Sequence, residues 1–315
     1  MSSSPSGKVF LTGGAGFIGL HVIERLLERG FTVRIFDSMM HRANRSDIEA
    51  LINGGSVELI ESDVRSGGAV QRAMDGCSHV IHFATVSINK SVADPDESLN
   101  INVIGNNNVF SAAANLGVKR LVYASSASVY GDPEILPMRE DSQTNPLTPY
   151  CISKLSGEHL LHFYSTQAGL SWNTLRFFNV YGPGQKTSAY YTSVINHFIN
   201  RLNAGQAPVI DGKGDQSMDF VHVYDVADAC VAALLSEVDG EVFNVGTGVS
   251  TSIAQLAHIL IRAVGVDVEP IFNPRDVLVS RRAADITKAK ELLGWAPKIS
   301  VEVGMASLVK DSKPK

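Results

Sequence analysis

A glycine-rich turn near the start of the chain constrains the fold more than any other feature. Residues 8–19, KVFLTGGAGFIG, read as an apolar strand that runs into closely spaced glycines and then into a helix. Gly13 permits a tight turn, Gly16 lets the backbone approach a pyrophosphate, and Gly19 allows the helix to pack close to the strand. The amino-terminal end of such a helix presents free N–H groups and the positive end of the helix dipole. The segment therefore predicts a βαβ unit that binds a dinucleotide.

The residue that ends the next expected strand selects between two dinucleotides. Residues 32–36 form an apolar strand pattern that ends at Asp37, eighteen residues after Gly19. A carboxylate at this place can accept hydrogen bonds from both hydroxyls of the adenine ribose, and it repels a 2′-phosphate. The sequence therefore favours NAD over NADP, and the alternative is a solvated acidic loop residue.

Strand-like and helix-like segments alternate along the first half of the chain. The expected strands cover residues 9–12, 32–36, 57–61, 79–84 and 121–125, and the expected helices cover residues 17–28 and 99–116. This rhythm is typical of an α/β fold with a doubly wound parallel sheet of the Rossmann type. Ligands of such sheets collect at the carboxyl ends of the strands. Asp63, Ala84 and Ser126 each follow an expected strand, so we expect them at one crevice.

The pattern changes after about residue 177. A helix is expected over residues 150–167 and a strand over 173–178. After residue 177 we expect helices over 191–203, 225–237, 253–263 and 287–293, and strands over 208–210 and 242–245, with residues 219–223 leading into the helix that begins at Asp225. We expect an NAD-binding Rossmann domain over residues 1–177 and a smaller, interleaved substrate-binding part over residues 178–315. A segment near 220–246 is expected to return to the first domain. The substrate should lie between the two parts.

Tyr150 and Lys154 stand four residues apart in an expected helix, which places a phenol and an ammonium on one face. The pKa of tyrosine normally lies near 10, and bringing it to neutrality takes about 4 kcal/mol. One ammonium at about 4 Å contributes about that much at an effective dielectric constant near 20. The spacing, with the hydroxyl-rich run 125–128 upstream, predicts that Lys154 keeps Tyr150 ionised as a base. The alternative is an ordinary helix face.

Composition and charge exclude several classes of protein. The chain has 315 residues, 19% of them charged, and a net charge of −5, which indicates neither a nucleic-acid nor a membrane-surface partner. No apolar run has the length to cross a bilayer, and residues 1–7 lack the apolar stretch of a secretory signal. The three cysteines, Cys77, Cys151 and Cys230, are widely separated and are interpreted as packing residues. A cytoplasmic protein is expected.

Together these features resemble the extended short-chain dehydrogenase/reductase family, and within it the NAD-dependent sugar-nucleotide epimerases and dehydratases. The resemblance covers nearly the whole chain and includes residues 102–105, 175–184, 219–227, 243–246 and 292–297. It implies that Ser126 bonds the 4-hydroxyl of the sugar, that Tyr150 is the base, and that Lys154 also holds the nicotinamide ribose. It also implies a homodimer, because the helices near 99–116 and 150–167 resemble those of a four-helix dimer interface.

The resemblance further assigns binding residues. Toward NAD it implies Gly13, Gly16, Phe17, Ile18, Gly19, Asp37, Asp63, Val64, Phe83, Ala84, Asn102, Tyr150, Lys154 and Phe177, with no metal. Toward the nucleotide sugar it implies Ser128, Asn179, Tyr191, Val194, Arg275 and Arg282. Core packing is the alternative for the phenylalanines, and a turn cap is the alternative for Asn179. His82, on an apolar strand, is expected to be a core histidine with its ring nitrogens bonded.

One departure concerns the diphosphate. Many relatives carry arginine where this chain has Met218, and a thioether cannot replace a guanidinium. The charge is then expected to be met by Arg275 or by the pair Arg281 and Arg282, with Arg282 favoured. The loop over residues 184–191 also lacks the arginine that UDP-glucuronate epimerases use against the sugar carboxylate, which favours a neutral sugar.

The residues after Ser126 distinguish among the chemistries of the family. The 4,6-dehydratases carry an Asp-Glu pair there, and UDP-glucuronate decarboxylases carry a glutamate at the second of these positions. This chain has Ala127 and Ser128, which cannot carry protons. We therefore expect epimerisation at C4 of a UDP-hexose or UDP-N-acetylhexosamine through a transient 4-keto intermediate, with NAD regenerated in each turnover.

Other readings stay open at this point. A dehydratase, decarboxylase or reductase with rearranged acids is one alternative. A non-catalytic nucleotide-binding protein on the same fold is another. The base of the nucleotide, the sugar and the pathway are not determined by the sequence.

Overall fold

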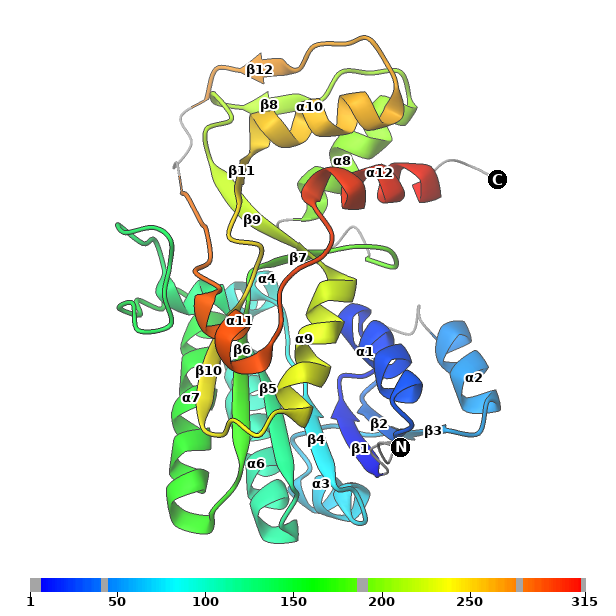
Figure 1. Ribbon diagram of the computed structural model, residues 1–315, viewed down its shortest axis with the longest axis vertical. Coiled ribbons are helices and arrows are strands. Elements are labelled where there is room, and N and C mark those ends of the chain that lie inside the picture. The colour runs from blue at the N-terminus through cyan, green and yellow to red at the C-terminus, as the bar shows by residue number, and fades with distance from the viewer. Residues whose placement is uncertain (1–6, 41–44, 186–191, 276–279, 313–315) are drawn as a thin grey trace.

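A seven-stranded sheet forms the centre of the computed structural model, which describes residues 7–40, 45–185, 192–275 and 280–312 (Figure 1). Neighbouring strands are parallel throughout this sheet. The strand order is β10 (Glu241–Val245), β6 (Trp172–Phe177), β5 (Arg120–Ser126), β4 (His79–His82), β1 (Lys8–Thr12), β2 (Thr32–Asp37) and β3 (Val57–Glu61). The order reverses between β1 and β4, and the carboxyl ends of strands at such a switch point form a ligand crevice.

Helices cover both faces of this sheet. One face carries α1 (Phe17–Glu28), α2 (Arg45–Asn53) and α9 (Val223–Leu235), and the other carries α3 (Gly67–Met74), α6 (Gly105–Leu116) and α7 (Pro149–Ala168). Alternate side chains of each strand enter the two cores: Val9 and Leu11 pack on the first face, and Phe10 packs on the second. Because both faces are buried, these strands read as continuous apolar runs.

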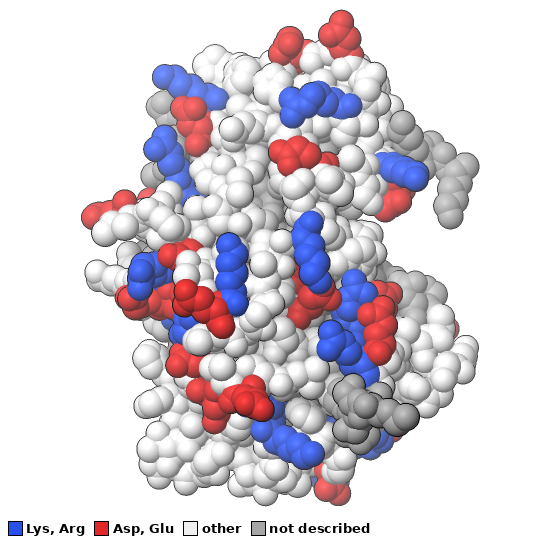
Figure 2. Space-filling model, in the orientation of Figure 1, with Lys and Arg blue, Asp and Glu red and all other residues white. Residues whose placement is uncertain are grey.

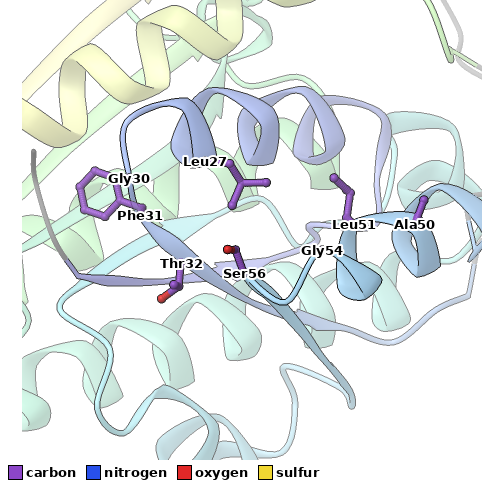
Figure 3. Close-up of a pocket in the computed structure, with 8 residues that line it drawn as sticks. All are labelled: Leu27, Gly30, Phe31, Thr32, Ala50, Leu51, Gly54 and Ser56. Atoms are coloured by element: carbon purple, nitrogen blue, oxygen red, sulfur yellow. The ribbon is translucent and has the colours of Figure 1, made fainter.

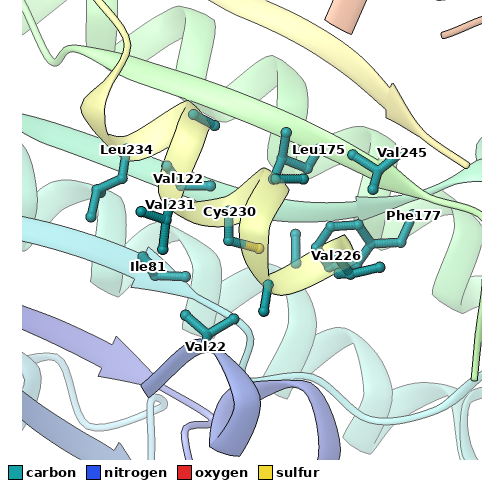
Figure 4. Packing of buried hydrophobic residues seen from close by; sticks show 14 of the residues in the cluster. Val22, Ile81, Val122, Leu175, Phe177, Val226, Cys230, Val231, Leu234 and Val245 are labelled. Carbon is teal, nitrogen blue, oxygen red and sulfur yellow. The ribbon is translucent and has the colours of Figure 1, made fainter. Parts of the chain in front are cut away.

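The core between the sheet, α1 and α9 is shown in Figure 4. Val22 from α1 and Cys230 from α9 lie against Ile81, Val122 and Leu175 of the strands. Burial raises the pKa of the Cys230 thiol well above its usual range. The interpretation of this cysteine as a packing residue is confirmed.

A smaller part, built from the C-terminal half, lies above the carboxyl ends of the large sheet in Figure 1. It contains a three-stranded sheet of β7 (Asn179–Tyr181), β9 (Ser217–His222) and β11 (Ser250–Ser252), and a pair of strands, β8 (Val209–Asp211) and β12 (Ile271–Asn273). The helices α8 (Thr192–Asn203), α10 (Ile253–Val264) and α12 (Val301–Ser312) enclose a third apolar core with these strands. Ser252 and Gln255 form a capping box that starts α10.

Most expected elements are present, and three have the expected bounds: α1, β3 and α11 (Thr287–Leu293). The helix expected over residues 99–116 is present, but it begins earlier and consists of α5 (Pro95–Leu99), a π-helical turn (Asn100–Ile104) and α6 without a break between them. Several elements were not predicted: α2, α3, α4 (Ile88–Ala93), α12, β7, β11, β12 and the 3₁₀ turn Ala127–Tyr130. Many of these are short, and short segments carry little periodic signal.

Acidic and basic side chains intermix over the face of the molecule shown in Figure 2. No helix among the described residues combines the length and apolarity needed to cross a bilayer.

Candidate active site

The glycine turn packs tightly between the first strand and the loop after β4. Gly13 has a φ of +65°, and a Cβ atom there would lie 2.7 Å from the backbone nitrogen of Ala84. At Gly19 a Cβ atom would lie 2.6 Å from the carbonyl oxygen of Gly14. At Gly16 the only neighbour within 4 Å would be the Gly13 carbonyl oxygen, at 3.1 Å. Only glycine fits at the first two positions, and at the third a Cβ atom would make one tight contact.

The first turn of α1, which contains Phe17, Ile18 and Gly19, has no side-chain cap and no acidic residue. Asp37 lies beside it, at the carboxyl end of β2. The Asp37 carboxylate accepts hydrogen bonds from the backbone N–H groups of Ala15 (3.0 Å) and Met39 (2.8 Å), which fix its position. An uncapped helix amino terminus next to a carboxylate fits the diphosphate and adenine ribose of NAD.

Four further residues expected at the cofactor follow β3 and β4. Arg65 donates to both carboxylate oxygens of Asp63, from Nε (2.9 Å) and NH2 (2.6 Å), and these hydrogen bonds lower the pKa of Asp63. Val64 is buried beside it. Phe83 and Ala84 come directly after β4, and the Ala84 N–H donates to the Thr12 hydroxyl (3.1 Å). These positions line the same edge of the sheet as the glycine turn.

Two other expected cofactor residues are engaged by the protein itself. Asn102, in the π-helical turn, is buried, and its Oδ1 accepts from Val86 N (2.9 Å) and Thr85 Oγ1 (3.1 Å). Its side chain therefore holds the loop after β4. Phe177 ends β6 and belongs to the core of Figure 4, with its ring centroid 6.2 Å from that of Phe83.

Ser126, Tyr150 and Lys154 meet at the carboxyl end of β5. The Tyr150 hydroxyl forms a hydrogen bond with the Ser126 side chain, and Ser126 Oγ accepts from Ser128 N (3.2 Å). Lys154 Nζ donates to the Ala124 carbonyl oxygen (2.8 Å) and lies 5.5 Å from the centroid of the Tyr150 ring. The four-residue spacing on α7 thus brings the phenol and the ammonium together, as the sequence predicts.

The protonation states of this cluster differ from the prediction. Burial raises the pKa of Tyr150 to about 12, although the hydrogen bond with Ser126 lowers it. Burial also lowers the pKa of Lys154 to about 7. The expectation that Lys154 keeps Tyr150 ionised is therefore wrong for the cofactor-free chain. Lys154 is buried and Tyr150 is partly buried, and the loss of water disfavours the charged form of each.

A buried chain of hydrogen bonds under the site was missed by the sequence analysis. It links Thr12 Oγ1 to His82 Nδ1 (2.5 Å), His82 Nε2 to Asn106 Oδ1 (2.8 Å) and Asn106 Nδ2 to the Tyr123 hydroxyl (3.0 Å). The Tyr123 ring centroid lies 5.2 Å from Lys154 Nζ. Burial lowers the pKa of His82 to about 3, so the ring is neutral and bonded at both nitrogens. His82 is confirmed as a core histidine, but partners so distant in the chain carry no local signal.

Four of the residues expected at the nucleotide sugar lie in the smaller part: Asn179, Val194, Arg275 and Arg282. Asn179, on β7, donates from Nδ2 to the Asp219 carbonyl oxygen (3.2 Å). Val194, on α8, packs against the third core. Tyr191 lies outside the described residues.

Two of the positions discussed for the diphosphate are occupied by other interactions. Arg275 is exposed and forms an ion pair with Asp211 (3.0 Å). Met218, in β9, is buried in the third core. The thioether therefore serves packing.

Arg282 contacts the loop after β5, which carries Ser128. The Arg282 guanidinium donates to two backbone carbonyl oxygens of this loop, from NH1 to Ala127 (3.3 Å) and from NH2 to Gly131 (2.7 Å). Arg282 Nε and Ser128 Oγ are both buried and have no hydrogen-bond partner among the described residues. The arginine thus reaches from the smaller part to the turn that follows Ser126.

The depression in Figure 3 is separate from this cluster. It has a volume of about 300 Å³ and is lined by Leu27, Gly30, Phe31, Thr32, Ala50, Leu51, Gly54 and Ser56. Thr32 begins β2 and Ser56 precedes β3, so the depression lies at the amino-terminal ends of these strands. None of the expected site residues lines it.

Comparisons with known proteins give matches along almost the whole chain. The model of the NAD dependent epimerase/dehydratase family matches residues 9–246. A UDP-glucose 4-epimerase of Mycolicibacterium smegmatis is 35% identical over 96% of this chain and 97% of its own. The crystal structure of UDP-glucose 4-epimerase from Thermotoga maritima with UDP-glucose has a TM-score of 0.85 at 33% identity and covers 96% of this chain and 97% of its own. The structure of a UDP-N-acetylglucosamine 4-epimerase from Methanobrevibacter ruminantium has a TM-score of 0.87 at 29% identity, with 97% of each chain covered.

Proposed function

Since this chain belongs to the NAD-dependent epimerase/dehydratase family, we propose that it inverts the configuration at C4 of a UDP-hexose or UDP-N-acetylhexosamine, with NAD as cofactor. The observation that carries the proposal is the meeting of Ser126, Tyr150 and Lys154 at the carboxyl end of β5. The glycine turn at the carboxyl end of β1 supports it, because Gly13 has the conformation and the close neighbours that this turn requires.

Ser126, Tyr150 and Lys154 have different roles in the transfer of the proton of the 4-hydroxyl. Bound NAD supplies an acceptor and donor of hydride at C4 and, in its oxidised form, a positive charge. Tyr150 takes the proton of the 4-hydroxyl as C4 becomes a ketone, and Ser126 holds the same oxygen through its hydroxyl. The 4-keto sugar then rotates in the site, and Tyr150 returns the proton when C4 is reduced on its other face. Lys154, held by the Ala124 carbonyl, places its amino group beside the phenol.

Tyr150 must lose its proton before it can act as a base. With a pKa of about 12, the phenol is protonated at neutral pH in the cofactor-free chain. The hydrogen bond with Ser126 and any positive charge brought next to the phenol both lower this pKa. We infer that ligand binding, more than Lys154 alone, sets the working protonation state.

The test is incubation of the protein with UDP-glucose and UDP-N-acetylglucosamine, followed by identification of the products by mass and NMR. We expect an isomer of unchanged mass. Tyr150→Phe should lower kcat by about 10²- to 10⁴-fold. Tyr164→Phe is the matched control, because its hydroxyl lies on the same helix but bonds Asn107 Oδ1 (2.9 Å). A product lighter by one water or one carbon dioxide would contradict the proposal, as would a Tyr150→Phe variant as fast as wild type.

We also propose that the protein is a homodimer that pairs through α6 and α7. Ile152 and Phe163 are 49% and 52% exposed, and they are eleven residues apart on α7, so they share one face. Ile104, before α6, is 49% exposed. An apolar face of this kind is typical of an interface. Light scattering should give a dimer mass at micromolar concentration and a lower mass for Phe163→Glu; a monomer mass for the wild type would reject the interface.

A cytoplasmic location remains a proposal as well. Cys77, Cys151 and Cys230 are free and buried, which suits a reducing compartment.

A further inference from the structure

The Arg282 guanidinium carries a charge that no ion pair of the described residues compensates. Two of its nitrogens donate to the carbonyl oxygens of Ala127 and Gly131, which are neutral. The third, Nε, is buried and has no acceptor, and the buried hydroxyl of Ser128 on the same loop has no partner either. Unsatisfied buried donors are costly, so this arrangement indicates a ligand with oxygen acceptors.

The position of Arg282 is fixed from both sides. Its backbone N–H donates to Ser217 O (3.0 Å), and two residues later Ala284 N donates to the buried carboxylate of Asp219 (3.0 Å). On the other side, Gly131 accepts from Arg282 with a φ of +70°, a conformation that favours glycine. The guanidinium is therefore preorganised on the loop.

This loop begins at the residue that the proposed function places on the 4-hydroxyl of the sugar. Ser128 N bonds Ser126 Oγ (3.2 Å), and Ala127, whose carbonyl accepts from Arg282, lies between them in the chain. In a nucleotide hexose the diphosphate is attached at C1, across the ring from C4, whereas C3 and C5 are the neighbours of C4. Arg282 therefore lies where we expect the substituents of C3 and C5, and of these only C6, attached at C5, can be a carboxylate.

We propose that Arg282 recognises a carboxylate at C6, so that the preferred substrate is a UDP-hexuronic acid. The inference rests on the proposed C4 epimerisation and replaces the neutral sugar of that proposal with an acidic one. A carboxylate compensates the guanidinium charge and accepts hydrogen bonds from both Arg282 Nε and Ser128 Oγ. The hydroxymethyl group of a neutral hexose leaves the charge without a partner. The proposal departs from the neutral sugar that the loop over residues 184–191 favours.

The kinetic test compares kcat/KM for UDP-glucuronate, UDP-glucose and UDP-N-acetylglucosamine. The wild type should prefer UDP-glucuronate. Arg282→Met keeps much of the side-chain length but removes the charge, and it should lower kcat/KM for UDP-glucuronate by about 10- to 100-fold more than for UDP-glucose. Arg282→Lys, which keeps the charge but not the planar fork, should fall between them. Arg262→Met, at an exposed position on α10, is the control for loss of one positive charge.

A binding series separates the carboxylate from the other roles that Arg282 could have. UDP, UDP-glucose and UDP-glucuronate are titrated calorimetrically into Tyr150→Phe, with and without Arg282→Met, so that no turnover occurs. Selective loss of UDP-glucuronate affinity supports the proposal. An equal loss of affinity for UDP would instead show that Arg282 contacts the diphosphate. An equal loss of affinity for all three ligands, together with a lower melting temperature, would show that Arg282 only stabilises the loop. Either result overturns the proposal.

Failure of this inference is distinguishable from failure of the proposed function. If the wild type epimerises neutral sugars and Arg282→Met changes no preference, the carboxylate site is rejected while C4 epimerisation stands. If no nucleotide sugar is epimerised, the proposed function fails, and the binding series still decides whether Arg282 selects the carboxylate.

Discussion

A buried ion pair next to the catalytic strand offers a sharp test of how the site is held in place. Arg176 on β6 and Glu158 on α7 are joined by two hydrogen bonds, Nε to Oε1 (3.0 Å) and NH2 to Oε2 (2.7 Å), and their side chains are only 6% and 7% exposed. Ser125 Oγ also donates to Glu158 Oε1 (2.5 Å), and Arg176 NH1 donates to the Tyr130 hydroxyl (2.8 Å). The pair thus connects the strand that ends at Ser126 to its neighbours.

The cost of breaking this pair follows from its burial. Glu158→Gln removes the negative charge and leaves the guanidinium of Arg176 buried without compensation, which should lower the free energy of unfolding by about 3–5 kcal/mol. For a chain of this size that corresponds to a melting temperature lower by roughly 5–10 °C. The double variant Glu158→Leu, Arg176→Met removes both charges and should recover more than half of the loss, because buried ion pairs replaced by apolar side chains are often close to neutral.

Guanidinium denaturation and differential scanning calorimetry measure these differences. Asp141→Asn is the matched control, because the ion pair of Asp141 (73% exposed) with Arg139 (66% exposed) lies at the surface. We expect no change in melting temperature for this variant. Two results would refute the reasoning: a Glu158→Gln variant as stable as wild type, or a double variant no more stable than Glu158→Gln.

Three further predictions concern the turn, the lysine and the smaller part. Gly13→Ala should abolish NAD binding, which is measured by protein fluorescence. Gly55→Ala is the control: Gly55 has a φ of +78° but nothing within 4 Å, so this variant should only lower the stability by the backbone strain of about 1–2 kcal/mol. The pKa of Lys154 is about 7 in the folded chain and near 10.4 in the unfolded chain. Between these pH values only the unfolded chain holds the proton, so the free energy of unfolding should rise with pH by up to about 1.4 kcal/mol per pH unit. Lys154→Met should lack this rise in denaturation curves taken at pH 7, 8 and 9, and parallel curves would show that the lysine is charged when folded. Asp219→Asn should speed hydrogen exchange at Ala284 N and its neighbours, because the carboxylate accepts four hydrogen bonds that an amide cannot all accept; unchanged exchange would reject this anchoring role.

Features that depend on near neighbours in the chain were predictable from the sequence. The glycines and apolar residues after β1 define the turn and the bounds of α1, because a tight turn and a helical period are local properties. Tyr150 and Lys154 lie together because they are four residues apart on one helix, which starts where Thr148 caps it and Pro149 takes its first position. The same short-range signals gave the bounds of α11.

Features that depend on distant residues were decided by the tertiary structure. The π-helical turn Asn100–Ile104 interrupts a pattern that reads as one helix, and Asn102 within it bonds the loop after β4. Arg282 reaches a loop about 150 residues earlier in the chain, so its place beside Ser128 could not be read from spacing.

The protonation states of Tyr150 and Lys154 show most clearly what the sequence determines and what the tertiary structure decides. The sequence by itself determined that a phenol and an ammonium would be neighbours, and the attraction between them predicted an ionised tyrosine. Only the packed structure decided how much water each of them loses, which raises the pKa of Tyr150 and lowers that of Lys154. The reason is physical: spacing along a helix fixes which groups meet, but the loss of water around them depends on every segment that packs over the site.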